Sequence, residues 1–112
     1  MSSFKAGLCQ TPVFSDKQKN LEAAGAMISE AAARGCQLVV LPEMFNCPYV
    51  SEAFPRFAEP VPGGETFEFL KNAAAREGVY LIGGSIPERT DDGHVFNTSL
   101  IFGPSGQPLG MH

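Results

Sequence analysis

A glutamate that directly follows a buried strand is the residue best placed for chemistry in this sequence. The run Leu38–Leu41 is continuously apolar and ends at Pro42, and Glu43 comes next. In an open α/β sheet, ligands gather at the carboxyl ends of the strands. Pro42 restricts the backbone at this point, so the direction of the carboxylate is fixed rather than averaged. Glu43 is therefore a candidate catalytic carboxylate, with a solvated loop glutamate as the alternative.

Cys47 lies four residues beyond Glu43, and a thiol beside a carboxylate could serve as a nucleophile. A carboxylate alone raises the pKa of a thiol through like-charge repulsion, and the sequence shows no cationic partner nearby. A buried, unreactive thiol is therefore the favoured interpretation. Cys9 and Cys36 lie in or beside expected strands and are interpreted as small core residues.

The other chemical motifs are incomplete. Ser85 lies in Gly83–Pro87, which lacks the final glycine and the following helix of a nucleophile elbow, so a structural role is expected. The same glycines form neither a dinucleotide fingerprint nor a phosphate-binding loop. The sequence contains no Cys-x-x-Cys pair, and His94 and His112 are isolated. Asn97 begins a glycosylation acceptor pattern that we expect to stay unmodified. We expect no metal and no organic cofactor.

Length and composition restrict the function classes. The chain has 112 residues, enough for one small domain or a part of a larger one, and carries a net charge of −4 with 44% apolar residues. An acidic balance without a Lys/Arg cluster argues against partners such as nucleic acid or an anionic membrane. No run approaches the roughly 18 apolar residues of a membrane-spanning helix. Because there is no secretory signal pattern and the cysteine count is odd, we expect a cytoplasmic protein, with a mitochondrial location as the alternative.

The elements that must position Glu43 alternate between strand and helix. We expect a short strand over Phe4–Gln10 and then a helix that a capping box of Ser15 with Gln18 opens and that runs to about Arg34. The apolar residues of this helix recur at spacings of three and four and form one buried stripe: Leu21, Ala24, Met27, Ile28 and Ala31. The run Leu38–Leu41 is typical of a strand covered on both faces in a mostly parallel sheet.

The second half of the chain begins with a long connection. Residues Pro42–Gly64 interleave five prolines with four aromatic residues, which indicates an ordered, partly buried loop with one short helical turn. A second helix is expected over Glu65–Glu77 and a strand over Val79–Ile82. A hairpin then joins Ile86–Arg89 to Val95–Phe102. The fold class is α/β.

An ordered set of motifs resembles the nitrilase superfamily of carbon–nitrogen hydrolases, and within it the omega-amidase branch. The matching segments run through essentially the whole chain: Leu8–Gln10, Asn20–Leu21, Leu38–Tyr49, Tyr80–Glu88, Phe96–Thr98 and Phe102–Gly106. The resemblance implies that residues 1–112 are the N-terminal portion of a carbon–nitrogen hydrolase domain, an incomplete part of an α-β-β-α sandwich.

The resemblance also implies a Glu–Lys–Cys triad that hydrolyses amides through a cysteine thioester. Glu43 falls on the general base of the family. The resemblance places the family's lysine and nucleophilic cysteine beyond His112, and neither Lys71 nor Cys47 matches their positions. We therefore expect residues 1–112 alone to be inactive.

The branch resembled implies small α-keto amides, α-ketoglutaramate and α-ketosuccinamate, as substrates. One alternative is another enzyme of the superfamily: a different amidase, a nitrilase or a carbamoyl-amine hydrolase. The other is a non-catalytic remnant that binds a partner. Phe45 and Tyr49 follow Glu43 closely and are candidate substrate-binding residues, with simple packing in the loop as the alternative. We expect a homo-oligomer when the protein is full length.

Overall fold

Strands and helices alternate along the first two thirds of the chain, and strands alone complete it. The computed structural model describes residues 4–112. Its elements in chain order are β1 Ala6–Leu8, α1 Lys17–Ala33, β2 Leu38–Val40, α2 Phe54–Phe57, α3 Glu65–Glu77, β3 Tyr80–Ile82, β4 Ile86–Arg89, β5 Val95–Thr98, β6 Leu100–Phe102 and β7 Pro108–Met111. The α/β class is confirmed, and α2 is the short helical turn expected in the long loop.

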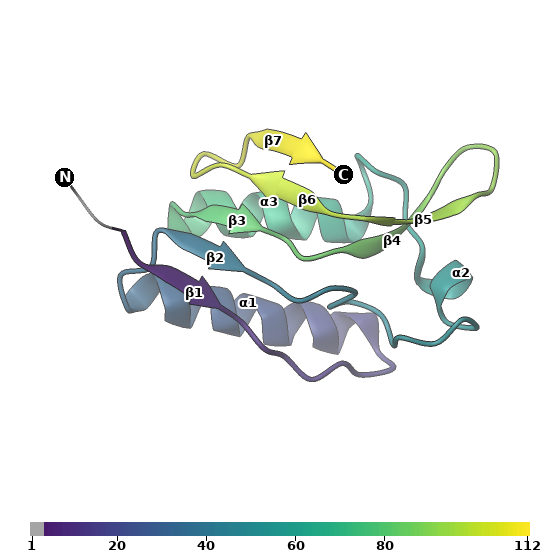
Figure 1. Cartoon of the computed structure of the whole chain (residues 1–112), viewed down its shortest axis with the longest axis horizontal. Coiled ribbons are helices and arrows are strands. Elements are labelled where there is room, and N and C mark those ends of the chain that lie inside the picture. The colour runs from purple at the N-terminus through teal and green to yellow at the C-terminus, as the bar shows by residue number, and fades with distance from the viewer. Residues whose placement is uncertain (1–3) are drawn as a thin grey trace.

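A five-stranded sheet with the order β1-β2-β3-β6-β7 forms the main layer (Figure 1). Strands β1, β2 and β3 are parallel, whereas β6 and β7 join antiparallel. Val39 of β2 pairs with Gly7 on one side and Leu81 on the other. Strand β2 is thus flanked by parallel neighbours, and the residues that follow it emerge where the carboxyl ends of three strands meet.

The apolar run Val95–Phe102 contributes to two sheets. Strand β5 pairs with β4 in a separate two-stranded sheet, and β6 pairs with β3. Between them, Ser99 exchanges backbone hydrogen bonds of 2.7 and 2.9 Å with His112. The expected hairpin is therefore correct up to Thr98 and wrong beyond it, because the change of partner depends on strands that are distant in sequence.

Asp16 is the N-cap of α1, and its carboxylate accepts a hydrogen bond of 2.9 Å from the backbone N–H of Gln18. The expected capping box that begins at Ser15 is therefore wrong. A carboxylate caps at least as well as a hydroxyl, and its charge also interacts favourably with the positive end of the helix. The stops are as expected, because Gly35 and Gly78 follow the two long helices with φ of 87° and 66°.

Both long helices lie on one face of the main sheet (Figure 1) and pack against each other and against the strands. The core contains residues from both long helices, from β2, β3 and β6, and from the segment after β2: Leu21, Ala24, Ile28, Val39, Leu41, Phe45, Leu70, Leu81 and Phe102. Val39 is fully buried, whereas its neighbours Leu38 and Val40 on the opposite face are only half-buried. The expected cover on both faces of this strand is therefore present on one face only.

The face of the sheet away from the helices is apolar and open. Phe4, Leu38, Tyr80, Ile82 and Ile101 line a hollow on it, and Tyr80 is 49% exposed. Within residues 4–112, no helix is long and apolar enough to cross a lipid bilayer.

We predict that residues 1–112 in isolation self-associate and bind a hydrophobic dye, because an uncovered apolar face and open strand edges drive association. Tyr80→Lys should weaken this association. The matched control is Val50→Lys, since Val50 is 52% exposed on the loop before α2 and does not line the apolar hollow. Size-exclusion chromatography over a range of concentrations checks this. A compact, concentration-independent monomer with strong amide-exchange protection would contradict it.

Candidate functional site

Glu43 begins the turn that follows β2 and lies on the rim of an open hollow of about 340 Å³. The hollow is lined by residues from four separate segments of the chain: Glu43, Gly84, Ser85, Asn97, Ser99 and His112. The carboxylate is exposed, as a group that meets a ligand must be. The structure thus places the predicted catalytic residue at the carboxyl end of the parallel strands.

Ser85, on the connection between β3 and β4, stabilises the turn that carries Glu43. The backbone N–H of Met44 donates a hydrogen bond of 3.0 Å to the buried Ser85 Oγ. Met44 adopts φ 52°, a left-handed conformation that a side chain disfavours by about 1 kcal/mol. Ser85 therefore has the structural role expected from the sequence, since its hydroxyl stabilises this unusual turn.

Gly84 brings the connection between β3 and β4 into direct contact with the backbone that leads to Glu43. It adopts φ 61°, and a Cβ at this position would lie 2.0 Å from the carbonyl oxygen of Pro42. Only glycine fits such a close approach. Because the connection crosses here, the β4–β5 hairpin lies beside the Glu43 turn.

This hairpin supplies the polar partner of the carboxylate. Asn97 of β5 pairs with Pro87 of β4, and its Nδ2 donates a hydrogen bond of 2.7 Å to Glu43 Oε2. The two residues are 54 positions apart in the sequence. Among residues 4–112, no ion pair involves Glu43, so a neutral donor is the partner that fixes its orientation.

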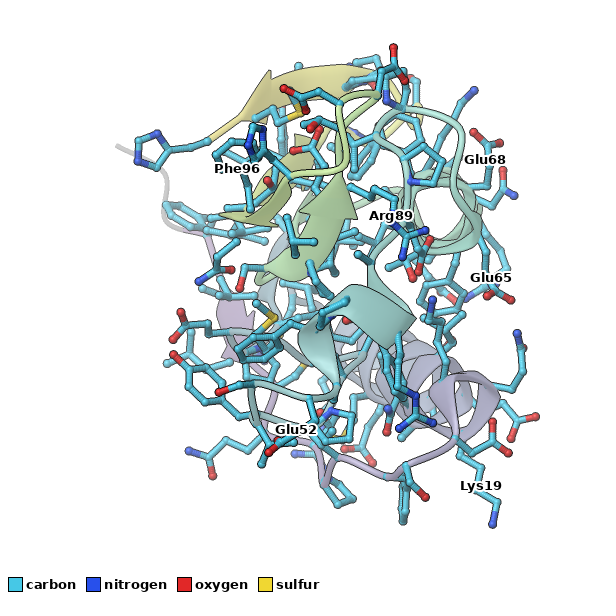
Figure 2. The ribbon with its side chains drawn as sticks, turned by 90° about the vertical axis from the view of Figure 1, so that its right-hand side faces the viewer. Lys19, Glu52, Glu65, Glu68, Arg89 and Phe96 are labelled. Carbon is cyan, nitrogen blue, oxygen red and sulfur yellow. The ribbon has the colours of Figure 1, made fainter. Side chains whose placement is uncertain are left out.

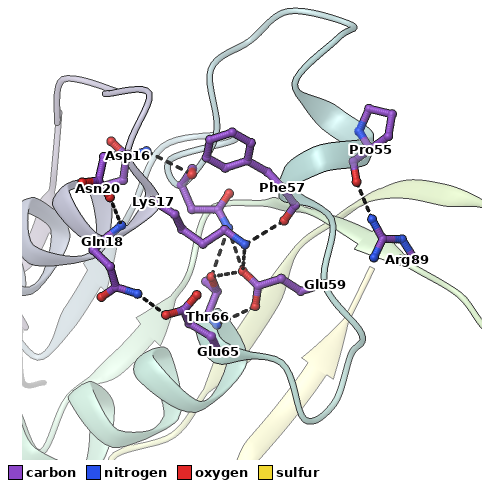
Figure 3. A network of polar contacts seen from close by, with 11 residues as sticks. Asp16, Lys17, Gln18, Asn20, Pro55, Phe57, Glu59, Glu65, Thr66 and Arg89 are labelled. Atoms are coloured by element: carbon purple, nitrogen blue, oxygen red, sulfur yellow. Dashed lines mark hydrogen bonds and ion pairs between the residues drawn. The ribbon is translucent and has the colours of Figure 1, made fainter.

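A buried polar network holds the loop that follows the turn (Figure 3). Its centre is Glu59, which is 5% exposed and forms an ion pair of 2.9 Å with Lys17. Glu59 also accepts hydrogen bonds from the backbone N–H of Thr66 at 2.7 Å and from the Thr66 hydroxyl. The charge of this glutamate is thus paired and hydrogen-bonded, as burial requires.

Asn46 connects the network to the turn. Its Nδ2 donates to Thr66 Oγ1 at 3.0 Å, and its backbone carbonyl accepts a hydrogen bond of 3.0 Å from Asn20 Nδ2. Asn46 is fully buried and lies three residues after Glu43, so its hydrogen bonds also fix the turn. Sequence reasoning missed Glu59 and Asn46. The one available signal was the presence of these polar residues in a loop expected to be ordered and partly buried.

The two candidate substrate-binding residues do not line the hollow. Phe45 is fully buried in the core beneath the sheet, which is the packing alternative. Tyr49 is 68% exposed, and its ring meets that of Phe54 edge to face at 5.6 Å. The structure therefore brings neither side chain to Glu43.

Cys47 is fully buried beside α2, where Ala53 and Phe57 enclose it. Burial raises the pKa of its thiol above the ordinary value, and the nearby Lys17 only partly opposes this. The thiol is therefore protonated near neutral pH and unreactive, as expected from the sequence. In the described part of the chain, no group of three or more His, Cys, Asp or Glu side chains could hold a metal ion.

Comparison with known proteins identifies related sequences. The family model for carbon–nitrogen hydrolases matches residues 5–112. Omega-amidase NIT2 of Xenopus tropicalis is 47% identical over 112 residues, which cover all of this chain and 40% of the relative. Human omega-amidase NIT2 is 44% identical over the same shares of the two chains.

Solved structures show the same relationship. Saccharomyces cerevisiae Nit3, described as a member of branch 10 of the nitrilase superfamily, superimposes with a TM-score of 0.90 at 34% identity, over 97% of this chain and 43% of that chain. The superfamily protein XC1258 from Xanthomonas campestris gives a TM-score of 0.83 at 32% identity, over 97% and 40% of the two chains.

The chain thus spans about 40% of the length of the curated relatives that it matches. The match extends over nearly every residue, and it includes the strands, the helices and the turn that place Glu43. The resemblance drawn from the ordered motifs is confirmed. This chain belongs to the carbon–nitrogen hydrolase family.

Proposed function

We propose that this chain supplies the general base of an omega-amidase that releases ammonia from small α-keto amides. The observation that carries the proposal is the placement of Glu43 at the carboxyl end of the parallel strands. Hydrogen bonds to Ser85 and from Asn20 fix the turn on which it lies. Its Oε2 is hydrogen-bonded to Asn97, and within residues 4–112 its Oε1 has no hydrogen-bond partner. That oxygen is thus available to take a proton. Omega-amidases among the relatives support the substrate class.

In the proposed reaction, Glu43 accepts the proton of a cysteine thiol as the sulfur attacks the amide carbon. The C–N bond of the resulting tetrahedral intermediate breaks, and Glu43 returns the proton to the departing ammonia. Glu43 then takes a proton from a water molecule that attacks the thioester carbon. The C–S bond breaks, the free acid forms, and Glu43 returns the proton to the released thiolate. A lysine stabilises the oxyanion in both halves of the reaction.

Residues outside this chain would supply that lysine and cysteine. Lys71 is exposed on α3, Cys47 is buried beside α2, and neither lines the hollow that contains Glu43. We accordingly propose that residues 1–112 alone release no ammonia from an amide.

The proposed role of Glu43 as general base can be tested in a chimaera in which residues 1–112 replace the matching segment of Xenopus tropicalis omega-amidase NIT2. Glu43→Gln should lower kcat for ammonia release by at least about 100-fold, because the amide cannot accept the proton. The melting temperature should not change, since Glu43 is exposed.

The matched control is Glu52→Gln, on the exposed loop that leads into α2 (Figure 2), which should keep the activity of the chimaera. Retention of activity by Glu43→Gln, with a normal melting curve, would sink the assignment of the general base.

The substrate class can be tested with the same chimaera and with the complete protein that contains this chain. Given α-ketoglutaramate and a simple aliphatic nitrile at equal concentrations, the enzyme should favour the keto amide in kcat/KM. A preference of the complete protein for the nitrile would assign it to another branch of the superfamily.

The close approach at Gly84 predicts a further effect on turnover. Gly84→Ala should lower both the melting temperature and kcat of the chimaera, because the new Cβ would displace the backbone at Pro42. Gly93→Ala is the matched control, since Gly93 also has a positive φ, 86°, but no atom within 4 Å of the added Cβ. It should lower the free energy of unfolding by only the roughly 1 kcal/mol that a side chain costs in the left-handed region, and it should leave kcat unchanged. Equal effects of the two variants on kcat would contradict a role for the contact with Pro42.

A further inference from the structure

We propose that Asn97 is a positioning residue that holds Glu43 Oε2 and thereby reserves Oε1 for the proton of the nucleophile. This inference rests on the proposed function of Glu43 as a general base. It starts from the hydrogen bond of 2.7 Å between Asn97 Nδ2 and Glu43 Oε2, which joins two segments that only the fold brings together.

Two contacts fix the backbone of Asn97, one with the neighbouring strand and one through the next residue in the chain. Its strand partner is the buried Pro87. The next residue, Thr98, is 4% exposed and donates a side-chain hydrogen bond of 2.6 Å to Glu88. A side chain as short as that of asparagine, projecting from such a fixed strand, defines the position of its amide closely. The carboxylate that it holds is then confined to one orientation.

The amide of asparagine suits this task chemically. Only its NH₂ group can face a carboxylate oxygen, because its carbonyl would be repelled. The amide is neutral and does not compete with Glu43 for the proton. When Glu43 Oε1 takes a proton from the thiol, Oε2 becomes the carbonyl oxygen of the acid and still accepts the hydrogen bond. The orientation of Glu43 is thus the same when it accepts the proton and when it returns it.

The side chain of Asn97 has no other hydrogen bond within residues 4–112. It is also exposed, so its replacement should disturb neither the core nor the buried network around Glu59. A positioning role and a structural role therefore predict different results. The first changes kcat alone, whereas the second changes the melting temperature and KM as well.

The test uses the chimaera of residues 1–112 with the remainder of the Xenopus omega-amidase. Asn97→Asp keeps the shape of the side chain but replaces the donor by an acceptor with a like charge. At pH 8 we expect kcat to fall about 10- to 100-fold with KM and melting temperature unchanged, since a displaced base loses much of its contribution. Asn97→Ala should cause a similar or smaller loss.

Lowering the pH separates the two variants. Two carboxylates within hydrogen-bond distance repel each other, so the pair takes up one shared proton at a higher pH than a lone aspartate does. As the pH falls from 8 towards 5, the introduced aspartate can then donate to Glu43, so the deficit of Asn97→Asp relative to the parent should shrink. The deficit of Asn97→Ala should not change, because alanine gains no donor. Asn72→Asp, an identical change at an exposed position of α3, is the control for charge and should match the parent at every pH.

The possible outcomes are distinguishable. Parent-like kcat in both Asn97 variants, with Glu43→Gln inactive, would overturn the positioning role and leave the general base in place. An active Glu43→Gln variant would overturn both proposals. A lower melting temperature with a parallel rise in KM, and no difference in pH dependence between aspartate and alanine, would assign Asn97 to the structure and overturn the positioning role.

Discussion

The buried carboxylate of Glu59 is the interaction on which the rest of this structure depends. It pairs with Lys17 at the start of α1 and accepts hydrogen bonds from Thr66 at the start of α3. Its backbone also pairs with β4, since its N–H donates to Pro87 and its carbonyl accepts from Arg89. Helix α3 has no side-chain cap of its own at Gly64, so Glu59 accepts the hydrogen bond of the Thr66 N–H in its place. Its charge adds to that of Glu65 and Glu68 in the first turn, which the positive end of the helix favours. Removing one partner of a buried ion pair costs about 3–5 kcal/mol, a large part of the roughly 5–15 kcal/mol that stabilises a small domain.

This network explains how the exposed carboxylate of Glu43, the proposed general base, can lie on a loop and still have a fixed direction. Asn46 connects the network to the turn through its hydrogen bond to Thr66, and Ser85 accepts a hydrogen bond from the backbone of the turn. Loops often carry function because a rigid scaffold positions them. Here the connection between the strand and the next helix is long, and buried polar contacts provide the rigidity that regular secondary structure does not. The exposed face of the same turn is left for Glu43 and its partner Asn97.

The features predicted from sequence are those that depend on local chemistry. Apolar spacing and the stops at Gly35 and Gly78 defined the two long helices, and the apolar run before Pro42 placed Glu43 correctly. One error arose between neighbours in the sequence, and the others arose where partners are distant. The choice of Asp16 over Ser15 as N-cap is a competition between neighbours that the pattern alone could not settle. The crossing between sheets at Ser99 depends on pairing with His112, and the contact of Asn97 with Glu43 spans 54 positions. From sequence, Asn97 was visible only as part of a glycosylation pattern and a family-like segment.

The position of β7 brings the end of the main sheet to the hollow that Glu43 lines. Strand β7 lies at the edge of the main sheet (Figure 1). The hydrogen bonds between Ser99 and His112 continue its pairing to the hollow that both residues line together with Glu43. Any residue that follows His112 in a longer chain would therefore begin at this rim. The triad implied by the family needs its lysine close to the glutamate, at a point where negative charge develops on the substrate. The sheet that positions Glu43, the proposed general base, thus also directs the chain towards the place where the proposed mechanism requires an oxyanion-stabilising group.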